Sequence, residues 1–173
     1  MAVSMANTSV PRWSARSVGS VEFDSRTPCY LVFVTDVRAL ADVATHRARI
    51  PAPSTVVDTR VVDVDAALAS ARTGWRFLVV GDGAGVARIR ARIVAAGAID
   101  EELITVVLGA DDGFDAGTRE VFCAHCRSTT ATGARIDETM TCGGCGVELV
   151  VYYHFSRRRH AYLGYSADAE NLS

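Results

Sequence analysis

Short apolar runs alternate with helical patterns along the middle of the chain. Unbroken apolar runs of this length, each closed by a polar or glycine turn, are typical of strands covered on both faces of a parallel sheet. These runs lie at 30–36, 75–82 and 102–109, with a less regular strand candidate at 54–61. Apolar residues recur at helical spacing in the segments 37–47, 63–74 and 83–97. We therefore predict an α/β fold that begins with a small doubly wound parallel-sheet domain.

Composition divides the chain into three parts. Residues 1–27 are rich in Ser, Thr, Ala and Arg and have no periodic pattern, so we expect a flexible arm with a short strand at 20–23. Residues 28–118 carry the α/β pattern. Residues 119–173 carry four of the five cysteines and a second strand-rich pattern. We expect this last part to be a four-cysteine zinc-ribbon-like β module with an interaction tail.

The charge and hydropathy of the chain narrow the classes of function. Its 173 residues include 18 basic and 20 acidic ones, which does not give the basic face of a general nucleic-acid-binding protein. No apolar run is long enough to span a membrane, and the N-terminus lacks the apolar segment of a secretory signal. We therefore expect a cytoplasmic protein with neither a membrane nor a nucleic acid as partner. Cytoplasmic thiols stay reduced, so clustered cysteines there indicate a metal site more than disulfides.

Four cysteines form two C-x2-C pairs near the C-terminus. They are Cys123 and Cys126, then Cys142 and Cys145, with fifteen residues between the pairs. Two such pairs offer four thiolates to one tetrahedral ion, and this spacing is typical of zinc sites. We predict that these four residues bind zinc, with rubredoxin-like iron or a [2Fe–2S] cluster as the alternatives. His125, inside the first pair, is expected to lie outside the ligand set.

A glycine-rich turn follows the strand at 75–82. Gly81, Gly83 and Gly85 lie where that strand passes into a helix, and backbone amides at such a place can bind a phosphate. They are the candidate cofactor-binding residues. The spacing is G-x-G-x-G, with Val86 at the usual position of the third glycine, which favours the alternative that the glycines only make a tight turn. NADP is therefore the less expected cofactor.

The segment 76–109 places a strand, this glycine turn, a helix ending in glycine and a further strand in series. This series resembles the last strand, helix and strand of the nicotinamide-binding domain of ferredoxin reductases. In that family the turn is of the Cys-Gly-Pro type, whereas this chain has Gly-Asp-Gly at 81–83. The resemblance implies a degenerate Rossmann-like or ferredoxin-reductase-like domain at 28–118.

The residues after the second cysteine pair predict a strand at 147–155. Its alternate residues are apolar on both faces, with Leu149 and Val151 on one face and Val150 and Tyr152 on the other. We therefore expect this strand to be buried on both sides.

Several further motifs follow in the C-terminal third. His-Phe-Ser-Arg-Arg stands at 154–158, an aromatic-Leu-Gly at 162–164 and Asp-Ala-Glu at 168–170. Together with the two cysteine pairs, these motifs resemble the C-terminal domain of the small DmmA-like subunit of bacterial dimethylamine monooxygenase. Agreement of several spaced motifs is more specific than a match to one of them.

This resemblance implies a multi-subunit, NADPH-dependent oxygenase of methylamine metabolism that demethylates dimethylamine. A haem-containing oxygenase subunit and a flavin and iron–sulfur reductase subunit are then the expected partners. The present chain is expected to be a small accessory subunit with a structural or electron-transfer-coupling role and no catalytic residue. The residues expected to contact a partner are His154, Phe155, Ser156, Arg157, Arg158 and Tyr162.

Two other classes of function stay open. The first is an electron carrier, in which the four cysteines bind iron. The second is a zinc-ribbon adaptor for nucleic acid or protein, which three adjacent arginines at 157–159 suggest.

Overall fold

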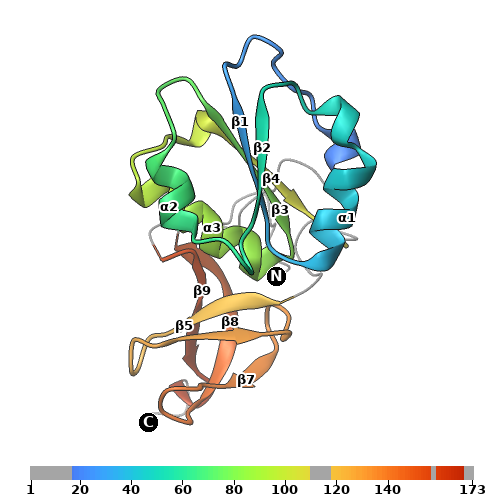
Figure 1. Cartoon of the computed structure of the whole chain (residues 1–173). Helices are drawn as coiled ribbons and strands as arrows, with labels where there is room; N and C mark the ends of the chain where they lie inside the picture. Colours follow the sequence, from blue (N-terminus) through green and yellow to red (C-terminus); the bar gives the residue numbers. More distant parts are fainter. Residues whose placement is uncertain (1–16, 110–117, 157–158, 170–173) are drawn as a thin grey trace. The chain divides into compact units, whose positions relative to one another are not determined.

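The computed structural model describes residues 17–109, 118–156 and 159–169 (Figure 1). These residues form two compact units, and each unit has a core of its own. The first unit holds residues 17–109, and the second holds the described residues between 118 and 169. None of the helices in the described ranges is both long and apolar enough to cross a membrane.

The first unit is a four-stranded parallel sheet with α1 on one face and α2 and α3 on the other (Figure 1). The strand order is β2-β1-β3-β4, so the direction of winding reverses between β1 and β3. The elements are β1 (Tyr30–Val34), α1 (Val37–Thr45), β2 (Ser54–Asp58), α2 (Val64–Ala69), β3 (Arg76–Gly81), α3 (Gly83–Ala95) and β4 (Leu103–Val107). Short 3-10 turns lie at Val18–Ser20, Arg47–Arg49 and Asp100–Glu102. The predicted doubly wound sheet is confirmed.

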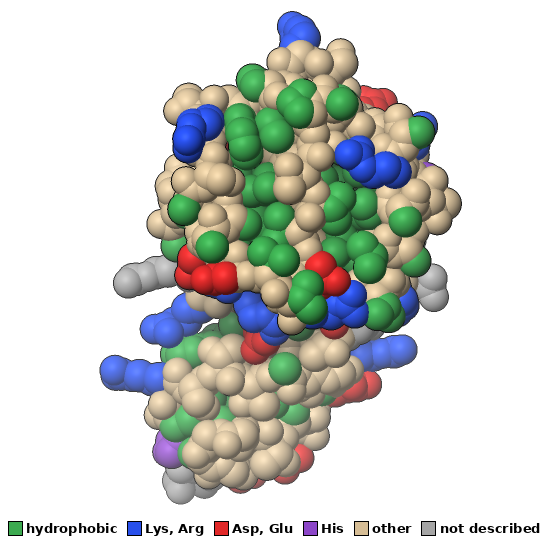
Figure 2. Space-filling view, viewed as in Figure 1, with side chains coloured by type: hydrophobic (Ala, Val, Ile, Leu, Met, Phe, Trp, Pro, Cys, Tyr) green, Lys and Arg blue, Asp and Glu red, His purple; other side chains and the backbone are tan. Residues whose placement is uncertain are grey.

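The burial of each strand in this sheet follows the pattern of apolar residues in its sequence. Every residue of β1 is buried, as are all residues of β3 after the first, because helices cover both faces. β2 lies at an edge of the sheet, where Thr55 and Val56 are exposed and Val57 is buried. Apolar side chains gather on the surface of the first unit in this view (Figure 2). A strand with one neighbour needs fewer apolar residues, which accounts for the less regular pattern at 54–61.

The described part of the N-terminal segment packs into the first unit, where a flexible arm was expected. Val18 and Val21 are buried in the core together with residues of β1 and α1. Residues 18–20 form a 3-10 turn in place of the start of the expected strand. Apolar burial of two valines fixes this segment, and residues 1–16 lie outside the described residues.

Asp42 of α1 anchors this segment by two hydrogen bonds. Its carboxylate accepts one from the Ser17 hydroxyl at 2.9 Å and one from the Val18 amide at 2.8 Å. The Val18 amide belongs to a fully buried residue, so this acceptor satisfies a group that water does not reach.

Asp42→Ala is expected to lower the free energy of unfolding by about 1–2 kcal/mol, because both hydrogen bonds are lost. Ser17→Ala removes the bond to Asp42 and the one that its hydroxyl accepts from the Gly19 amide at 3.1 Å, but it keeps the acceptor of the buried Val18 amide and is the milder control. Urea unfolding of the two variants measures the difference. An Asp42→Ala chain as stable as the wild type would contradict the anchoring role.

The second unit is a five-stranded sheet in the order β6-β5-β9-β8-β7. β5 and β9 run parallel, and the other neighbouring strands are antiparallel. Its core includes Val121, Leu149 and Val151 together with Cys123 and Cys142. The strands are β5 (Arg119–Cys123), β6 (Thr129–Thr132), β7 (Thr139–Thr141), β8 (Glu148–Ser156) and β9 (Ala161–Ser166). The predicted cysteine-rich β module is confirmed.

β8 is buried on one face, where burial on both was expected. Leu149, Val151 and Phe155 are buried, whereas Tyr152 is half-buried and His154 is exposed. The pairing of β8 with β9 shifts register between Val151 and Phe155, which interrupts the alternation of faces within the strand. The expectation of two buried faces is therefore wrong.

Candidate metal centre

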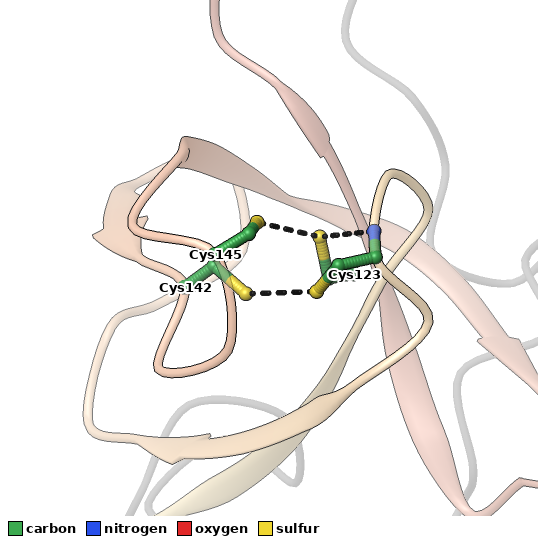
Figure 3. Close-up of side chains that lie close together, drawn as sticks. Cys123, Cys142 and Cys145 are labelled. Atoms are coloured by element: carbon green, nitrogen blue, oxygen red, sulfur yellow. Dashed lines mark hydrogen bonds between the residues drawn. The ribbon is translucent and has the colours of Figure 1, made fainter.

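Two hairpin turns bring the four cysteines together (Figure 3). Cys123 is the last residue of β5, and Cys126 lies in the turn that leads to β6. Cys142 directly follows β7, and Cys145 lies in the turn that leads to β8. The labelled thiols in Figure 3 come from these two turns and point toward one another. We call each C-x2-C turn a knuckle.

The four sulfur atoms have the spacing of a tetrahedral metal site. Sγ of Cys123 lies 3.9 Å from Sγ of Cys145, and Sγ of Cys126 lies 3.6 Å from Sγ of Cys142. All four sulfurs lie within 4.8 Å of one another. Metal–sulfur bonds of about 2.3 Å place the corners of a tetrahedron about 3.8 Å apart. The four cysteines are free thiols and can therefore bind a single metal ion.

The two knuckles are built alike. In each, the amide of the residue after the second cysteine donates to the carbonyl of the first cysteine at 2.9 Å. A further amide points at the sulfur of the first cysteine, from Cys126 to Cys123 at 3.5 Å and from Gly144 to Cys142 at 3.4 Å. Amides directed at sulfur favour the thiolate over the thiol. The turns therefore favour the thiolate form of these cysteines, which is the form that binds a metal.

Hydrogen bonds and burial act differently on the individual thiols. The Ser128 hydroxyl, followed by amides of the second knuckle, lowers the pKa of Cys142 to about 5. The same hydroxyl lowers the pKa of Cys126. At Cys145 the Val147 amide favours the thiolate, but burial and the neighbouring thiols raise the pKa to about 12. Without metal, these hydrogen bonds favour the thiolate at Cys142, whereas burial and the neighbouring thiols favour the thiol at Cys145, and metal binding requires the thiolate at both.

His125 lies within the first knuckle but outside the ligand group. Its side chain is exposed. Among the described residues, the group of ligand atoms at this place consists of the four sulfurs. Four sulfurs complete a tetrahedral site, so the geometry assigns no ligand role to His125.

Side chains of this chain occupy the space around the glycine turn that follows β3. A Cβ on Gly81 would lie 1.7 Å from the hydroxyl of Thr35, which follows β1. The Gly85 amide donates to the Asp82 carboxylate at 2.6 Å, and the Asp82 amide donates to the Asp36 carboxylate at 3.2 Å. A phosphate at this turn would compete for both amides and meet two groups of its own charge. The geometry is that of a tight turn, and cofactor binding by the three glycines stays a prediction.

The residues expected to contact a partner lie in different surroundings. Phe155 and Tyr162 are buried in the core of the second unit, with ring centroids 5.1 Å apart. His154 is exposed and Ser156 is half-buried, both near the end of β8. The arginines at 157–158 lie outside the described residues. Phe155 and Tyr162 therefore pack the core, and the accessible candidate among the described four is chiefly His154.

Comparison with known proteins gives a family match within the second unit and one relative that matches over a longer part of the chain. Residues 120–165 match the family model described as "Dimethylamine monooxygenase subunit DmmA-like, C-terminal domain". The heme-dependent oxidative N-demethylase delta subunit of Ectopseudomonas mendocina (strain ymp) is 40% identical over 126 residues. These residues are 73% of this chain and 66% of the length of that relative. No solved structure matches the chain. Residues 120–165 of the chain therefore belong to the family of DmmA-like C-terminal domains.

Proposed function

We propose that this chain is an accessory subunit of a multi-subunit, haem-dependent oxidative demethylase. The observation that carries the proposal is its 40% identity to a protein described as a delta subunit of such an enzyme. A haem-containing oxygenase subunit and a flavin and iron–sulfur reductase subunit are the proposed partners. Dimethylamine is the proposed substrate of the whole complex, and NADPH is the proposed source of its electrons.

Zinc is the proposed metal of the four cysteines, and its proposed role is structural. The short distances between the sulfurs support a single ion. In a [2Fe–2S] cluster each iron binds two of the four thiolates, which separates the two pairs more than one tetrahedron does. Zinc bound at Cys123, Cys126, Cys142 and Cys145 would join the β5–β6 and β7–β8 hairpins. Such a site contributes about 10–16 kcal/mol of apparent binding free energy, which is large for a module with so small a core.

A single iron is the second candidate, and it would make the chain an electron carrier. One iron ion fits the same sulfur spacing, and the thiol of Cys126 is exposed, so a redox partner could approach the metal closely. Absorption separates the two metals, because iron bound by thiolates is coloured and zinc is not. Metal content of the purified chain decides between them.

Co-purification tests the proposed assembly. We expect the chain to co-purify with the haem-containing and reductase subunits encoded by the same organism. The double substitution Arg157→Ala and Arg158→Ala is expected to weaken this association by roughly tenfold, because interfacial arginines make charge-assisted hydrogen bonds. Arg135→Ala, at an exposed arginine of the same unit, is the control.

The outcomes of this test separate two claims. Unchanged co-purification of the double variant would contradict only the proposed role of the two arginines. A wild-type chain that associates with neither subunit would contradict the accessory function itself.

A further inference from the structure

We infer that Ser128 is a positioning residue of the metal centre, whose hydroxyl bridges one thiolate of each knuckle. The inference rests on the proposed metal site. The Ser128 oxygen lies 3.0 Å from Sγ of Cys126 and 3.3 Å from Sγ of Cys142. Cys126 belongs to the first knuckle and Cys142 to the second, so one side chain contacts ligands from both hairpins.

The backbone fixes Ser128 in this place. Its carbonyl accepts a hydrogen bond from the Cys123 amide at 2.8 Å, which ties Ser128 to the last residue of β5. The next residue, Thr129, begins β6 and pairs with Phe122 of β5. The hydroxyl therefore reaches the two sulfurs from a fixed point of the first hairpin.

The second knuckle leaves the space that the hydroxyl occupies. A Cβ on Gly144 would lie 2.4 Å from the Ser128 oxygen and 3.1 Å from Sγ of Cys126. Any side chain at this position would therefore displace the hydroxyl or the sulfur. The Gly144 amide also donates to Sγ of Cys142 at 3.4 Å, so this residue serves the centre by its amide and by its lack of a side chain.

Metal binding sets the direction of the Ser128 hydrogen bond. A thiolate bound to a metal carries no proton, so it accepts and the hydroxyl donates. Ser128 has one hydroxyl hydrogen, which it directs to the nearer sulfur of Cys126 or shares with Cys142. Four thiolates carry more negative charge than a divalent ion neutralises, and a donor withdraws part of this charge from sulfur.

The effect is expected to be largest at Cys126. This thiol is exposed, whereas Cys123 and Cys142 are buried and Cys145 is half-buried. Chelators and other reagents reach an exposed thiolate first. Without the hydroxyl, the Cys126 thiolate loses one of its positional restraints, so it dissociates from the metal more readily.

Ser128→Ala tests the inference on the full chain. With zinc bound, we expect the affinity to fall by about 10- to 100-fold, and release to a chromogenic chelator to become faster accordingly. With cobalt(II) bound, we expect the sulfur-to-cobalt charge-transfer band at longer wavelength, because the sulfur lone pairs lose the stabilising donor. Thr129→Val removes a hydroxyl from the exposed neighbouring residue and is the matched control.

The outcomes distinguish failure of the inference from failure of the metal site. Equal release rates and equal band positions in Ser128→Ala and the control would overturn the inference and leave the metal site standing. A wild-type chain that binds no metal would overturn both.

Gly144→Ala provides a second variant, because its Cβ would displace the hydroxyl. It should also accelerate metal release, and combining it with Ser128→Ala should have less than the summed effect. A Gly144→Ala chain that releases metal no faster than the wild type would count against the bridge.

Discussion

Cys123→Ser is expected to abolish metal binding and to unfold the second unit, while the first unit stays folded. Cys123 is fully buried and belongs both to the sulfur group and to the apolar core of its unit. A serine there removes one of four ligands and leaves a buried hydroxyl. The unit then loses the binding free energy of the metal, about 10–16 kcal/mol in comparable small sites, which is as large as the whole stability of a typical domain.

Two measurements on the purified chain check this expectation. Elemental analysis should find one metal ion per wild-type chain and none in the variant. Limited proteolysis should cut the variant after residue 118 and spare the first unit, which has a core of its own. A strong chelator should reproduce the cleavage pattern in the wild type.

Cys29→Ser is the matched control for the loss of a buried cysteine. Cys29 is buried in the first unit, outside the sulfur group. This variant should keep its metal and its second unit. A Cys123→Ser chain that retains one metal ion and an intact second unit would contradict the four-cysteine site.

Local patterns in the sequence predicted much of the fold. The apolar runs of β1 and β3 were recognisable because helices bury both faces of these strands. The four clustered cysteines were recognisable because a knuckle is a local structure, with its two cysteines three positions apart in the sequence.

Features that depend on distant contacts were missed. The sequence has no signal that Val18 and Val21 enter the core, because both stand isolated among polar residues and Val18 is held by Asp42 of α1. Ser128 was missed for the same reason, since its second contact, Cys142, comes from another hairpin. A serine two positions after a knuckle was the available signal, and serine is common in turns.

The glycine turn shows how one motif can have two explanations that only packing separates. Three glycines at a strand-to-helix turn are compatible with a phosphate site or with a crowded turn. The side chain that crowds this turn is Thr35, which precedes Gly81 by 46 positions and directly follows β1, the neighbour of β3 in the sheet. No local pattern connects the two residues.

Gly81→Ala is expected to destabilise the first unit by about 3 kcal/mol, because the new Cβ has no space. It would lie 1.7 Å from the hydroxyl oxygen of Thr35, 2.9 Å from its Cβ and 3.2 Å from its methyl group. Backbone hydrogen bonds hold both Thr35 and Gly81 in place, so neither residue can move away easily. The Thr35 amide donates to the Val80 carbonyl at 3.1 Å, and the Gly81 carbonyl accepts from the Leu108 amide at 2.9 Å. Urea unfolding in the absence of any nucleotide measures the loss.

Thr35→Ala distinguishes the steric explanation from a ligand-binding one. It removes the hydroxyl and the methyl group of Thr35 and leaves only the Cβ contact, so Thr35→Ala combined with Gly81→Ala should recover a large part of the lost stability. If Thr35 leaves no space for a side chain at position 81, the double variant is more stable than Gly81→Ala alone. If the destabilisation persists unchanged in the double variant, crowding by Thr35 is not the reason for the glycine. That result would favour the alternative explanation, in which the glycines of this turn bind a phosphate.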